Sequence, residues 1–191
     1  MNRGDYACGG GSTDEGWERE SENPVWKEVR LAAAGCETIT SDIVDRWLRD
    51  ESPSATDAVA WLMTSNVDSI DEDVVEHASR RLAFRLFKVV ECATAALSAF
   101  DALLYIRALF VICWRRRKSS SKAVNAIATG LEGVLKKWPS DASDLVLLVV
   151  LEHLLPMPGV DVVFEKWLEH PVLKRVYAEG LRLSQQGGPQ G

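Results

Sequence analysis

One long stretch without a helix breaker constrains the fold most. Residues 71–118 contain neither glycine nor proline. As a single straight α-helix, these 48 residues would span roughly 70 Å at about 1.5 Å per residue, which is too long for a compact domain of 191 residues. We therefore expect two helices, separated by a break between Glu91 and Ser98. Small residues cluster there, and Thr94 or Ser98 could cap the second helix.

The remainder of the chain also has helical start and stop signals. Asn23 followed by Pro24 is typical of an N-cap and first helical position, and Gly35 marks the end of that helix. Two further pairs have capping-box spacing, namely Ser54 with Asp57 and Ser69 with Glu72. No stretch alternates apolar and polar residues with a period of two, as a half-buried strand would. The sequence therefore predicts an all-α fold of about seven to nine helices.

Three tryptophans stand near the ends of apolar helices, and each is followed by a proline that begins the next helix. The pairs are Trp47 with Pro53, Trp138 with Pro139 and Trp167 with Pro171. This punctuation, over about the last 75 residues, resembles the helix pairs of HEAT or armadillo repeats. The spacings of 91 and 29 residues between the tryptophans are not a repeat period. The prediction is therefore either an irregular helical bundle or a short HEAT/armadillo-like α-solenoid.

Composition divides the chain into three parts. Residues 1–23 are rich in Gly, Ser and acids, and they hold two basic and six acidic residues, so they carry -4 of the net charge of -6. Such a segment buries too little apolar surface to offset its ordering entropy, and we expect a disordered acidic tail. Residues 24–183 form the expected helical domain, and residues 184–191 form a flexible C-terminus.

The segment 92–114 has two interpretations. It is nearly all apolar and ends on Trp114 before a basic cluster, which is the pattern of a membrane span with a positive flank. Against this, Asp101 and Arg107 lie inside it, and each would cost about 2.5–3.5 kcal/mol near the bilayer centre. The favoured interpretation is a buried central helix in which both charged side chains reach the surface or pair with other helices.

The basic cluster after this segment is a candidate interaction site. It consists of Arg115, Arg116, Arg117 and Lys118, and we expect an exposed loop. The cluster could dock an acidic partner or serve as a nuclear-import signal. Ser119 follows it in a pattern favoured by basophilic kinases, so Ser119 is a candidate phosphorylation site whose modification would weaken acidic docking. The alternative is a solvated helix end whose cations complement the helix dipole.

Aromatic residues supply the other candidates for partner binding. The chain has seven tryptophans, and this residue is over-represented in binding hot spots. Trp138 and Trp167 are our candidate anchors, with core packing as the alternative. Trp17 lies between acids in the N-terminal tail, where an aromatic residue is plausible as a short docking motif.

Motifs for catalysis, metals and cofactors are missing from the sequence. The three histidines are in neither HExxH nor ExxH spacing, and there is no P-loop, dinucleotide-binding or nucleophile-elbow motif. The four cysteines, Cys8, Cys36, Cys92 and Cys113, form no CxxC pair. Cys92 and Cys113 lie in apolar sequence, where cysteine acts as a small hydrophobe. We expect no enzyme, no cofactor and a reducing compartment, either cytoplasmic or nuclear.

These features favour a non-catalytic protein-interaction module, such as an adaptor or scaffold subunit of a larger complex. Its partner would be another protein or a second copy of this chain. Two alternatives are a membrane-associated subunit inserted through 92–114 and a helical bundle that binds an apolar ligand. The weakest is a nucleic-acid module, which the acidic net charge disfavours. It would use the Arg115–Lys118 cluster together with Arg80, Arg81, Arg85 and Lys88.

Overall fold

The computed structural model describes residues 23–35, 38–92, 97–137 and 143–186. This part of the chain is helical, without strands, and its helices pack into a bundle. It contains nine helices when 143–154 and 161–169 are each counted as one. The predicted all-α class and helix number are confirmed. The last helix continues to Gln186, so residues 184–186, which we expected to be flexible, are helical.

The elements follow one another with short connections. They are α2 (Pro24–Ala33), α3 (Ser41–Trp47), α4 (Pro53–Ser65), η1 (Val67–Ser69), α5 (Glu72–Cys92), α6 (Ala99–Arg117), η2 (Lys118–Ser120), α7 (Lys122–Lys137), α8 (Ser143–Val146), η3 (Leu147–Leu151), α9 (Glu152–Leu154), α10 (Asp161–Phe164), η4 (Glu165–Glu169) and α11 (Pro171–Gln186). The η3 element is a π-helical turn that joins α8 to α9.

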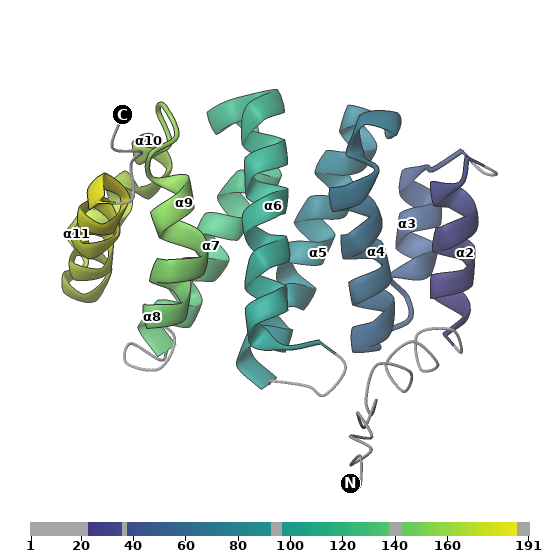
Figure 1. Cartoon of the computed structure of the whole chain (residues 1–191), viewed down its shortest axis with the longest axis horizontal. Coiled ribbons are helices and arrows are strands. Elements are labelled where there is room, and N and C mark those ends of the chain that lie inside the picture. Colours follow the sequence, from purple (N-terminus) through teal and green to yellow (C-terminus); the bar gives the residue numbers. More distant parts are fainter. Residues whose placement is uncertain (1–22, 36–37, 93–96, 138–142, 187–191) are drawn as a thin grey trace, which may run out of the picture.

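The helices stack in chain order in two layers (Figure 1). One layer contains α2, α4, α6 and the α8–η3–α9 segment, because α2 contacts α4, α4 contacts α6, and α6 contacts η3. The other layer contains α3, α5, α7 and α11, which contact one another in the same sequence. Helix α5 packs against α3, α4, α6 and α7 and is therefore held from several sides.

Several helices begin or end where capping residues in the sequence predicted. The side-chain oxygen of Asn23 accepts a hydrogen bond from the backbone N–H of Val25 at 2.8 Å, with Pro24 as the first residue of α2. Gly35, just after that helix, has a φ of 77°, which favours glycine. Ser98 Oγ accepts a hydrogen bond from the N–H of Asp101 at 3.1 Å, so Ser98 caps α6 as predicted.

Both predicted capping boxes were wrong by two residues. Helix α4 is capped by Ser52, whose Oγ accepts from the N–H of Ala55 at 3.1 Å, because Pro53 occupies the first helical position. Asp71 provides the corresponding acceptor at the start of α5, 2.8 Å from the N–H of Asp73. The Ser69 hydroxyl instead donates to the carbonyl of Asn66 within the preceding turn.

The interpretation of 92–114 as one membrane span was wrong. Helix α5 ends at Cys92 and α6 begins at Ala99. Asp101 lies exposed in the first turn of α6, and Arg107 donates to the carbonyl of Val149 at 3.3 Å. Both charged residues therefore behave as the buried-helix interpretation requires. Among the described helices, none combines the length and the apolar character that crossing a bilayer demands.

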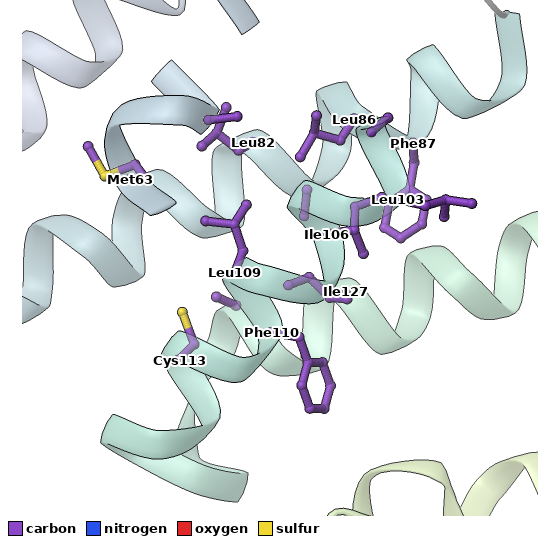
Figure 2. Packing of buried hydrophobic residues seen from close by; sticks show 14 of the residues in the cluster. Met63, Leu82, Leu86, Phe87, Leu103, Ile106, Leu109, Phe110, Cys113 and Ile127 are labelled. Atoms are coloured by element: carbon purple, nitrogen blue, oxygen red, sulfur yellow. The ribbon is translucent and has the colours of Figure 1, made fainter. Parts of the chain in front are cut away.

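Figure 2 shows part of the core, where buried side chains of α4, α5, α6 and α7 pack together. Leu82 and Leu86 of α5, Leu103 and Ile106 of α6 and Ile127 of α7 are almost completely inaccessible to solvent. Every fully buried methylene contributes about 0.8 kcal/mol to folding. This cluster therefore holds the two layers together.

Helix α7 approaches the Phe87 ring of α5 closely at Gly130. A Cβ atom built on Gly130 of α7 would lie 2.1 Å from Cε2 of Phe87, a residue of α5. At the other end of the contact, the Glu76 carboxylate accepts hydrogen bonds from Ser121 Oγ at 2.7 Å and from the N–H of Ala123 at 2.8 Å. Glu76 thus caps the start of α7 from α5 and fixes the register of the pair.

Two glycines of α7 should respond oppositely to substitution by alanine. Gly130→Ala should lower the free energy of unfolding by about 1–3 kcal/mol, because the new methyl group overpacks against Phe87. Gly133→Ala should raise it by up to about 1 kcal/mol, because its Cβ meets no atom within 4 Å and alanine favours helix. Urea denaturation of both variants checks this. Equal effects would contradict the close crossing.

Candidate functional site

The basic cluster at the end of α6 is partly used to hold the fold. Arg116 donates to the carbonyl of Val67 at 2.9 Å. Arg117 forms ion pairs with Glu72, at 2.7 Å, and with Asp73 at the start of α5. Hydrogen bonds with Asp73 and Glu72 raise the pKa of Arg117 above its ordinary value. The cluster is therefore less available to a partner than its sequence suggests.

The remaining members of the predicted site are divided between surface and core. Arg115, Lys118 and Ser119 are exposed, and Ser119 lies in η2, so it is accessible for modification. Trp167 is only 2 % exposed and packs edge-on against Phe164, with ring centroids 4.8 Å apart. It is therefore a core residue in this structure and provides no surface anchor. Trp138 lies outside the described residues.

A stripe of three residues on α5 is the most conspicuous outward feature. Arg80, Phe84 and Lys88 are spaced four residues apart, which places them on one helix face. Phe84 is 66 % exposed, although it is a large apolar residue. The Lys88 ammonium lies 4.7 Å from the centre of its ring, within the range of a cation–π interaction.

One surface hollow, which we call the first hollow, lies on the α4 side of this stripe. Its volume is about 570 Å³. Glu51 of the loop before α4 lines it together with Pro53 and Thr56 of α4, and Val89 of α5 contributes apolar surface. Basic side chains of α5 form the opposite wall: Arg80, Arg81, Arg85 and Lys88.

The second hollow lies on the α7 side and shares Arg80, Phe84 and Lys88 with the first. Its volume is about 680 Å³. Its apolar lining includes Phe87 and Val134, together with the glycines of α7. Polar and charged residues also line it: Glu91, Lys122, Asn125 and Thr129. We call the Arg80–Phe84–Lys88 stripe and its two flanking hollows the α5 surface.

The cations of the α5 surface fall into two groups. Arg85 donates to the carbonyls of Leu48 and of Asp50, the latter at 2.9 Å, and burial lowers its pKa. Arg81 forms an ion pair with Asp45 at 3.3 Å. Among the described residues, Arg80 and Lys122 have no ion pair or side-chain hydrogen bond. Two cations thus hold α3 against α5, and the others face solvent.

Sequence reasoning named the four basic residues of α5 but missed Phe84. The available signal was its position: Phe84 has the same four-residue spacing as Arg80 and Lys88, so it belongs to the charged face of the helix. The neighbouring Leu82, Ala83, Leu86 and Phe87 are all buried. Phe84 is therefore an apolar residue on the charged face of an amphipathic helix, where it lies between two surface hollows.

The described residues contain no group of three or more His, Cys, Asp or Glu side chains placed to hold a metal ion. Cys113 is buried, and burial raises the pKa of its thiol to about 11. Because the thiolate is the nucleophile, Cys113 is poorly suited to covalent catalysis at neutral pH.

Comparison with known proteins identified no relative. No family model, no curated protein and no solved structure matches the chain.

Substitution of Lys118, at the junction of α6 and η2, by glycine should stabilise the protein. Its φ of 50° and ψ of -135° lie in a region that is essentially reserved for glycine. Lys118→Gly should raise the free energy of unfolding by about 1 kcal/mol, because relief of strain exceeds the entropic cost of glycine. Thermal denaturation checks this, with Lys122→Gly as the control. Lys122→Gly should be destabilising, and equal effects would contradict the strained junction.

Proposed function

We propose that this protein is a peptide-binding module whose α5 surface accepts an acidic segment of another protein. That segment carries an aromatic or other large apolar side chain. The single observation that carries the proposal is the exposed Phe84, which lies between two cations and separates two hollows. The stacked two-layer order of the helices supports an adaptor related in architecture to α-solenoids, which present such elongated helical faces.

The chemistry of the surface matches that partner in two ways. An aromatic side chain packed against Phe84 would remove its ring from water, at about 25 cal/mol per Å² of apolar surface buried. Carboxylates beside it would face Arg80 and Lys88, and such complementarity gives selectivity and a faster association rate. Arg80 also lines both hollows, so one cation could serve an acid on either side of Phe84.

A protein segment fits this surface better than a nucleic acid does. Glu51 and Glu91 line the hollows and would repel a continuous row of phosphates. Arg81 and Arg85 are already engaged with α3 and the loop that follows it. Isolated carboxylates can be placed between these acids, whereas a phosphate backbone has a fixed charge repeat. Of the predicted site, Arg115 and Lys118 remain exposed cations that could extend the contact.

Charge reversal of the stripe should weaken peptide binding strongly. The probe is a fluorescein-labelled peptide of Asp, Glu and Phe, titrated by fluorescence anisotropy against the full chain. Arg80→Glu with Lys88→Glu should weaken binding about tenfold or more, because both attractive charges become repulsive. The matched control is Lys174→Glu with Arg175→Glu, an exposed pair on α11 with the same change in net charge. Binding should persist in the control.

Two results of this titration would reject the proposal. An equal loss in both charge-reversed variants would mean that net charge alone drives binding. A single-stranded oligonucleotide that binds through Arg80 and Lys88, while the peptide does not, would identify a nucleic-acid surface instead.

Removal of the Phe84 ring should weaken peptide binding but leave the stability of the fold almost unchanged. Because the side chain is largely exposed, Phe84→Ala should change the free energy of unfolding by no more than about 0.5 kcal/mol. It should nevertheless weaken peptide binding about tenfold, as for an aromatic hot spot. Phe100→Ala is the matched control, because Phe100 is 50 % exposed and lines neither hollow. Peptide affinity that is unchanged by Phe84→Ala would place the binding site elsewhere.

A further inference from the structure

We propose that the acidic segment 14–20 of this chain occupies the α5 surface in cis and competes with the partner. This inference rests on the proposed function, because it names an internal occupant of the same surface. The segment reads Asp-Glu-Gly-Trp-Glu-Arg-Glu. It therefore combines a central aromatic residue, Trp17, with four acids and one base, a net charge of -3.

The described chain begins beside the first hollow. The Asn23 amide donates to Ser52 Oγ at 3.3 Å and to the Asp50 carboxylate at 3.4 Å. A hydrogen bond from the N–H of Ser52 lowers the pKa of Asp50, so this acceptor is charged at neutral pH. Pro53, the next residue after Ser52, lines the first hollow. The point from which residues 1–22 extend is therefore fixed next to the α5 surface.

The chain is long enough for the contact. Trp17 precedes Asn23 by six residues. At about 3.3–3.6 Å per extended residue, this gives a reach of roughly 20 Å. Arg80 and Lys88 are eight residues apart along the helix, or about 12 Å. This reach exceeds the length of the stripe, so the segment is long enough to extend from Pro53, at the first hollow, along the stripe.

Charge selects the part of the segment that docks. Asp50 accepts a hydrogen bond from Asn23, and Glu51 lines the first hollow, so acids of the segment are disfavoured next to these two carboxylates. Beyond them, the wall of the surface is basic. Acids further up the chain thus meet Arg80, Lys88 and Lys122, which leaves Trp17 to pack against Phe84. The segment has the composition of the partner proposed above, so the two compete for the same contacts.

Photocrosslinking in the full chain tests the contact directly. Trp17 is replaced by benzoylphenylalanine, and the irradiated protein is digested and analysed by mass spectrometry. We expect intrachain crosslinks to residues 80–91 that are lost in Arg80→Glu with Lys88→Glu. They should persist in the control, Lys174→Glu with Arg175→Glu. Crosslinks to other elements, or crosslinks that join two chains and disappear on dilution, would overturn the proposal.

A competition measurement separates this inference from the proposed function. Glu15→Lys, Glu18→Lys and Glu20→Lys are combined in the full chain, and the labelled peptide is titrated as before. Affinity should rise several-fold, because the internal competitor no longer binds. Peptide binding that is equally tight with and without these substitutions would overturn the cis contact and leave the proposed function intact. A peptide that binds neither protein, while residue 17 still crosslinks to α5, would overturn the proposed function and support the cis contact.

Discussion

The close crossing of α5 and α7 determines how the rest of the molecule is arranged. Phe87 lies against Gly130 where a side chain on α7 would collide with it, and Glu76 caps the start of α7 from the other end of the contact. These two constraints fix both the distance and the register of the helices. Helix α5 also packs against α3, α4 and α6, so neighbouring helices hold it from several sides. If the α5 surface binds a peptide as proposed, a stripe on such a helix would lose little conformational freedom, which would reduce the entropic cost of the contact.

The basic residues of the chain have two different uses. Arg85 and Arg117 each hold together elements that lie 35 to 45 residues apart in the sequence. Arg80 and Lys88 stand on the same helix as Arg85 but face solvent. Sequence composition cannot separate these uses, because the partners of a structural arginine come from distant segments. The difference matters for function, since an arginine that already holds backbone carbonyls has fewer donors for a ligand.

Features that depend on neighbouring residues could be predicted from the sequence, whereas features that depend on distant segments could not. The caps at Asn23 and Ser98, the Gly35 stop and the break after Cys92 depend on neighbouring residues, and all were predicted. The Ser54 and Ser69 caps failed because Pro53 and Asp71 offered better local geometry two residues away. The burial of Trp167 and the ion pairs of Arg117 depend on tertiary packing. The basic residues of the α5 surface could be found by their charge, whereas the hollows beside them required the three-dimensional structure.

A contact within one chain need not be strong to regulate the α5 surface. Short flexible tethers give effective concentrations of the order of millimolar. A segment whose intrinsic dissociation constant is also about millimolar would then occupy the surface half of the time. A partner would experience an apparent affinity lowered about twofold, and a tenfold tighter segment would lower it about elevenfold. Since each exposed ion pair contributes about 0–1 kcal/mol, a change of one or two charges in the segment can shift this balance several-fold. The strength of inhibition would therefore depend on the charge of residues 14–20, while the fold that presents the surface stays unchanged.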